Sequence, residues 1–176
     1  FQTQPYTGTR ATESLVRTRL AQTDILHLAA HGSYDSINPL FSHIDLAATA
    51  RDDGKLEVHE ILNLPLSAVN LVVLSACESG EGSLSRGDEI VGLTRAFLYA
   101  GTPTLVTSLW AVDDEATAAL MVGFYQNLQQ GASVAAALQA AQVAVLRHDN
   151  WRAPYYWAAF GGYGNGAQTL QTAGPQ

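Results

Sequence analysis

The most apolar run of the chain, residues 71–76 (Leu-Val-Val-Leu-Ser-Ala), most strongly limits how it can fold. Leucine and β-branched side chains followed by the glycine-rich residues 78–82 are typical of a strand buried inside a parallel sheet. Residues 23–30 and 104–109 carry similar runs, and helical patterns separate the three. Alternating strands and helices predict an α/β fold, a mostly parallel sheet with helices on both faces.

The remaining patterns complete one domain. Residues 44–46 and 55–57 lie on either side of an Asp-Gly step, which predicts a hairpin. Residues 33–39 are predicted to form a polar loop, and residues 156–161 a last short strand. Apolar spacing and polar caps predict helices over 11–21, 58–64, 88–99, 113–128 and from 133 onward. We expect one domain over residues 1–166 and a flexible tail over residues 167–176.

Composition excludes several partners. The net charge is −7 and no lysine or arginine cluster is present, which argues against nucleic-acid binding. An acidic surface weakly favours a basic ligand, although most acidic surfaces serve solubility. No apolar stretch approaches the roughly 20 residues that span a bilayer, so no membrane partner is expected. The five histidines form no HExxH and the glycines form no GxGxxG, so neither metal nor cofactor is expected.

Cys77 is the only cysteine, and it directly follows the run 71–76. A single cysteine allows no internal disulfide and fits a reducing, cytoplasmic compartment. His31 ends the earlier run 23–30. If the two strands are parallel neighbours, both side chains lie at the carboxyl edge of the sheet, where α/β proteins bind ligands.

This placement makes Cys77 and His31 a candidate nucleophile and base. Thiol attack on a carbonyl needs a base and donors for the oxyanion, and the backbone N–H groups of Gly32 and Cys77 are the expected donors. The alternative is that Cys77 is an inert buried thiol, which is the common role of a cysteine in an apolar strand. Its position at the strand end and the His-Gly step at another strand end favour the catalytic interpretation.

Several stretches, in the same order along the chain, resemble the CHAT domain family. These caspase-like modules belong to peptidase clan CD, are related to separase, and often follow tetratricopeptide repeats. The resemblance covers roughly residues 5–163. The matching stretches are residues 26–32 (LHLAAHG), 74–80 (LSACESG), 87–93 (GDEIVGL), 96–101 (AFLYAG), 108–114 (SLWAVDD) and 156–160 (YWAAF).

The resemblance implies a caspase-like three-layer sandwich and cysteine endopeptidase chemistry, with the catalytic dyad on His31 and Cys77. It also implies a helix and a strand ahead of residue 5, so the domain is expected to be trimmed at its N-terminus. Protein or peptide substrates are the expected partners, with tetratricopeptide repeats or other regulatory domains in the same chain.

Substrate preference is predicted from three residues. In clan CD the residue two before the cysteine often lines the S1 pocket, and here it is Ser75, which supplies no charge. Separase cleaves after arginine and carries an acidic residue in a segment that resembles residues 110–114, so Asp113 or Asp114 is expected to attract a basic P1 side chain. The alternative for either aspartate is a helix N-cap alone.

An interaction module is the alternative to an enzyme. The same caspase-like domain would then act as a signalling platform that is catalytically silent until a partner domain rearranges the loops 33–39 and 80–87.

Overall fold

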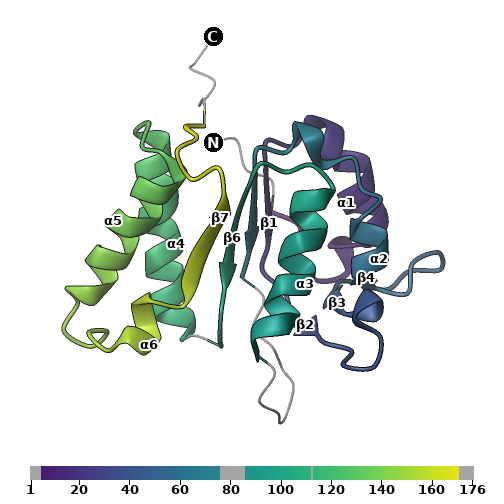
Figure 1. The fold of residues 1–176 in the computed structure, drawn as a ribbon, viewed down its shortest axis with the longest axis horizontal. Helices are drawn as coiled ribbons and strands as arrows, with labels where there is room; N and C mark the ends of the chain where they lie inside the picture. The colour runs from purple at the N-terminus through teal and green to yellow at the C-terminus, as the bar shows by residue number, and fades with distance from the viewer. Residues whose placement is uncertain (1–4, 76–85, 112, 171–176) are drawn as a thin grey trace.

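The computed structural model describes residues 5–75, 86–111 and 113–170 (Figure 1). Its main sheet has four strands in the order β1-β5-β6-β7. β1, β5 and β6 are parallel and β7 runs antiparallel to β6, which confirms a mostly parallel α/β sheet. The bounds are β1 (Ile25–Leu28), β5 (Leu71–Leu74), β6 (Thr104–Ser108) and β7 (Phe160–Gly164).

Helices cover both faces of this sheet (Figure 1). One face carries α4 (Asp114–Gln129), α5 (Val134–Leu146) and α6 (Pro154–Trp157), and the other carries α1 (Glu13–Arg19), α2 (Val58–Ile61) and α3 (Arg86–Tyr99). Short 3₁₀ helices connect the elements: η1 (Gly8–Arg10), η2 (Leu20–Gln22), η3 (Pro39–Phe41) and η4 (Leu66–Ala68).

β5 separates two hydrophobic cores because successive side chains of a strand point to opposite faces. Leu71 and Val73 belong to the core under α4 and α5. Val72 and Leu74 belong to the core on the other face. All four residues are buried, which explains why β5 itself has no polar position.

A second, antiparallel sheet has the order β2-β3-β4 and contains β2 (Gly32–Ser33), β3 (His43–Asp45) and β4 (Lys55–Glu57). The pairing of β3 with β4 confirms the predicted hairpin. β2 was not predicted, since residues 32–33 belong to a segment with polar loop character. Gly54 has φ 87° and donates its N–H to the buried Glu13 carboxylate at 2.9 Å, which anchors the end of the hairpin loop to α1.

The predicted strand over residues 156–161 is wrong in its first half. α6 ends at Trp157, and β7 begins only at Phe160. Pro154 occupies the start of α6, a favoured position because its missing N–H has no helical partner there. The indole N–H of Trp157 donates to the Arg152 carbonyl at 3.1 Å and holds this turn. Further on, Thr169 bridges to Ser133, and the side chain of Leu170 is buried.

Candidate functional site

The carboxyl ends of β1 and β5 lie at the same edge of the main sheet. Leu28 is the register partner of Leu74, and the N–H of Ser75 donates to the Leu28 carbonyl at 2.9 Å. His31 follows Leu28 by three positions, and Cys77 follows Leu74 by three positions. Cys77 lies outside the described residues, so the dyad stays a prediction that the register supports.

His31 is held by the small sheet as well as by β1. Its carbonyl accepts a hydrogen bond from the N–H of Asp45 at 2.8 Å, and the residue is exposed to solvent. Gly32 opposes Ile44 in the next position of the same antiparallel pair. Hydrogen-bonded and non-hydrogen-bonded pairs alternate along such a ladder. Since His31 is hydrogen-bonded to Asp45, the next residue, Gly32, is in a non-hydrogen-bonded pair, and its N–H points to the outer edge of β2. The Gly32 N–H is therefore not used by β3.

The three residues predicted to line S1 also follow strands of the main sheet. Ser75 is half-buried, directly after β5. Asp113 is the N-cap of α4, and its Oδ1 accepts the N–H of Ala116 at 2.9 Å. Asp114 is exposed in the first turn of that helix. Asp113 therefore serves as the N-cap of α4, whereas Asp114 is exposed to solvent.

A histidine–tyrosine pair connects β1 to α4. The Tyr125 hydroxyl lies 2.9 Å from Nδ1 of His27. His27 is an exposed residue of β1, and partial desolvation of its ring beside Tyr125 lowers the pKa of His27. Burial likewise raises the pKa of the Tyr125 phenol, so the hydroxyl keeps its proton and stays neutral beside the His27 ring. Sequence reasoning missed Tyr125 because no local pattern links residues on different elements.

The His27–Tyr125 pair predicts a loss of stability in mild acid. A histidine whose folded pKa is lowered contributes stability above its unfolded pKa of 6.5, and this contribution is lost as the pH falls through the folded value. We therefore expect the free energy of unfolding to decrease from pH 7.5 to pH 5, and His27→Gln to reduce that decrease. Urea unfolding at both pH values measures this. An equal decrease in His27→Gln and in His148→Gln would contradict the prediction.

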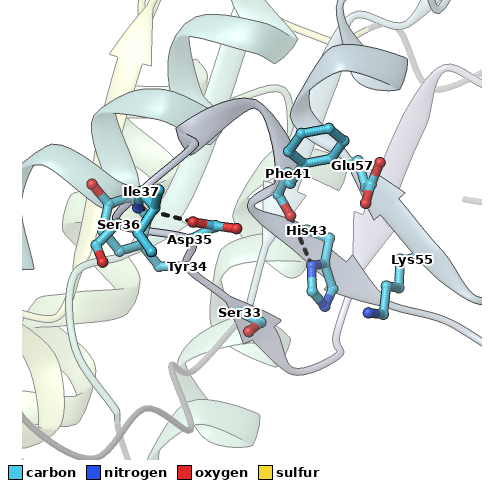
Figure 2. A pocket seen from close by; sticks show the side chains of 9 residues that line it. All are labelled: Ser33, Tyr34, Asp35, Ser36, Ile37, Phe41, His43, Lys55 and Glu57. Atoms are coloured by element: carbon cyan, nitrogen blue, oxygen red, sulfur yellow. Dashed lines mark hydrogen bonds between the residues drawn. The ribbon is translucent and has the colours of Figure 1, made fainter.

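A pocket of about 390 Å³ lies on the polar face of the small sheet. The segment that follows β2 forms one wall, and side chains of β3 and β4 form the other (Figure 2). No sequence pattern pointed to it, because its members come from separate segments. The lining residues are Ser33, Tyr34, Asp35, Ser36, Ile37, Phe41, His43, Lys55 and Glu57.

The described part of the chain contains no group of three or more histidine, cysteine, aspartate or glutamate residues that could hold a metal ion. Among the described helices, none is long and apolar enough to cross a membrane.

Comparisons with known proteins identify a family and two relatives that this chain resembles. The family model of the CHAT domain matches residues 1–165. Tetratricopeptide repeat protein 28 of Mus musculus is 30% identical over an alignment of 190 residues that covers 89% of this chain. The Homo sapiens protein of the same name is 28% identical over the same share of the chain. The chain spans 8% of the length of either relative.

Proposed function

Because the chain belongs to the CHAT domain family, a family related to caspase-like proteases, we propose that it is a cysteine endopeptidase with a His31–Cys77 dyad. The observation that carries the proposal is the register of β1 and β5, in which Leu28 pairs with Leu74. Each dyad residue follows its paired leucine by three positions. β1 and β5 thus both end at the sheet edge where α/β folds bind ligands.

The proposed reaction passes through an acyl-enzyme. His31 takes the thiol proton of Cys77, and Sγ attacks the peptide carbonyl carbon. The N–H groups of Gly32 and Cys77 stabilise the oxyanion. His31 then protonates the departing amine as the C–N bond breaks and a thioester remains. Water, deprotonated by His31, attacks the thioester, releases the carboxylic acid and restores the thiol.

The position of Gly32 supports its role as an oxyanion donor. Its N–H points to the outer edge of β2, because in the alternating pattern His31 makes the backbone hydrogen bond to β3 and Gly32 does not. Gly32 is buried, and because a glycine has no Cβ, no side chain of its own blocks the approach of a substrate carbonyl to this N–H. The Asp45–His31 bond at 2.8 Å fixes the adjoining backbone before a substrate arrives, as preorganised stabilisation requires.

The three-layer arrangement in Figure 1 supports a caspase-like sandwich as the architecture of the domain. The thiol of Cys77 must stay reduced to act as a nucleophile, which fits a cytoplasmic location. The named relatives are tetratricopeptide repeat proteins, so repeats or other regulatory domains in the same chain are the proposed intramolecular partners.

We propose that a basic P1 side chain pairs with Asp114, next to the neutral Ser75. Asp114→Ala is expected to reduce cleavage after arginine about tenfold relative to cleavage after glutamine, because it removes the exposed carboxylate and keeps the cap. Kinetics on two peptides that differ only at P1 measure this ratio. Asp113→Ala is the matched variant, and it is expected to cost about 1 kcal/mol of stability through the lost cap. An unchanged ratio in both variants would exclude the aspartates as the source of specificity.

A catalytically silent interaction module is the second candidate function. The small share of each relative that this chain covers favours it, because a domain within a long repeat protein can act by binding alone. A library of peptides with arginine or lysine at P1 distinguishes the two functions. Cleavage that depends on Cys77 supports the peptidase, whereas no cleavage by either the domain or its full-length protein supports the module.

A further inference from the structure

The small sheet places a carboxylate directly opposite the proposed base. The N–H of Asp45 on β3 donates to the His31 carbonyl at 2.8 Å. Gly32 pairs with Ile44 in the next register position, so His31 and Asp45 are opposite residues of one antiparallel ladder. The Cβ atoms of opposite residues lie about 4.5–5.5 Å apart, a gap that a carboxylate and an imidazole can bridge.

The His31 and Asp45 side chains share the solvent face of the small sheet. Side chains of a strand alternate between its two faces, so Ile44, between His43 and Asp45, points the other way. Ile44 is 0% exposed and belongs to the core beneath the sheet. His31 and Asp45 are both exposed. The burial of Ile44 therefore fixes the face on which the Asp45 carboxylate lies.

The neighbours of Asp45 leave its carboxylate available. Among the described residues no ion pair joins it to Lys55, its register partner on β4. Its Oδ1 lies 3.4 Å from Nε2 of His43. Nδ1 of His43 lies 3.0 Å from the Phe41 carbonyl, which only accepts hydrogen bonds, so Nδ1 carries the proton. Neutral His43 therefore presents an unprotonated Nε2, which cannot donate to Asp45.

A histidine that acts as a base needs a group that orients its ring. The imidazole must present an unprotonated nitrogen to the thiol, and a carboxylate that accepts the N–H of the other nitrogen selects that tautomer. The same carboxylate stabilises the imidazolium that forms when the base takes the proton. Asp45 is the carboxylate that the ladder of the small sheet places beside His31.

We propose that the Asp45 carboxylate positions the His31 imidazole, so that the site is a Cys77–His31–Asp45 triad. The carboxylate turns from His43 towards His31 and accepts the N–H of the ring nitrogen that does not face the thiol. Catalytic hydrogen bonds are often long before substrate binds and tighten in the complex. No proton passes to Asp45 during the reaction. This role rests on the proposed peptidase function and supplies the group that orients its base.

Asp45→Asn tests the role, because it removes the charge and keeps the size of the side chain. We expect kcat on a peptide with arginine at P1 to fall about 10- to 100-fold, since a misdirected ring slows the reaction of bound substrate. KM should change by less than about twofold, because Asp45 is not proposed to touch the substrate. Asp45→Glu keeps a carboxylate and is expected to recover part of the lost kcat.

Asp53→Asn is the matched control. It removes a carboxylate from the loop of the same hairpin, and the new amide oxygen can still accept the Lys55 N–H that Asp53 Oδ1 accepts at 2.9 Å. It is expected to keep the kcat of the unaltered protein. Equal kcat in Asp45→Asn and the unaltered protein would overturn the proposal. A loss that comes with a lower urea midpoint and is not recovered in Asp45→Glu would also overturn it, because that pattern marks a structural role.

Failure of the peptidase proposal is separable from failure of the positioning role. If no peptide is cleaved, ¹⁵N NMR spectra at about pH 8.5 report the tautomer of the His31 ring. Its signals are assigned by their loss in His31→Gln. One dominant tautomer in the unaltered protein and a different distribution in Asp45→Asn support the positioning of His31 on a silent domain. The same distribution in both proteins rejects it.

Discussion

Replacing Cys77 by alanine is expected to abolish peptide cleavage, with a loss of about 10⁴-fold or more in kcat, because no other thiol in the chain can form the acyl-enzyme. His31→Ala is expected to cost about 10²- to 10⁴-fold, the usual contribution of a general base. Steady-state kinetics on a peptide with arginine at P1 measure both losses. Circular dichroism establishes that each variant is folded.

Two further measurements sharpen this expectation. Iodoacetamide should alkylate Cys77 in the unaltered protein and more slowly in His31→Ala, because the thiolate reacts and the thiol does not. His148→Ala is the matched histidine variant, since His148 lies near the end of α5 and stacks on Trp151 at 4.0 Å between ring centroids. It should leave cleavage and alkylation unchanged. Equal alkylation in His31→Ala and the unaltered protein would exclude His31 as the base.

Phe124→Ala is expected to destabilise the fold by about 3–5 kcal/mol, the usual cost of removing a buried aromatic side chain. Phe124 is fully buried in the core between α4 and the main sheet. A typical domain has only about 5–15 kcal/mol of stability, so this single change removes a large share of it. Urea unfolding followed by tryptophan fluorescence measures the difference.

The same helix provides the control for that experiment. Val122, two positions away in α4, is 57% exposed, so Val122→Ala should change the free energy of unfolding by less than about 0.5 kcal/mol. A loss below about 1.5 kcal/mol in Phe124→Ala would show that the core closes around the vacated space. It would also show that α4, and with it the cap at Asp113, depends less on this core than its burial indicates.

The sequence was enough to predict that β1 and β5 end at the same edge of the sheet, because parallel strands in an α/β fold present their carboxyl ends together. The uninterrupted apolar run also located β5, and the helical spacing of apolar residues located α4, the helix that Asp113 caps. The α6 region was misplaced, since an aromatic run before Phe160 resembles a strand. The proline at its start and the indole–carbonyl bond of Trp157 decide for a helical turn.

The pocket could not be predicted from the sequence, for a different reason. Lys55 and Phe41 are distant in any local pattern, and only the register of three short strands and the turn at Asp35 brings them to one cavity. Which residues face each other across strands depends on the tertiary fold, and the hydrophobic periodicity of a sequence does not reveal it. The same limit applies to the hydroxyl–imidazole contact between Tyr125 and His27.

The order β2-β3-β4 has a consequence for mutagenesis of the small sheet. β3 gives the N–H of Asp45 to the His31 backbone and, two positions earlier, places His43 in the pocket wall. A change at His43 is therefore expected to disturb the pocket and the backbone beside His31 together. Lys55 lies one strand farther away, on β4. Substitutions meant to alter the pocket alone should therefore begin at β4, which does not contact the His31 backbone through its own hydrogen bonds.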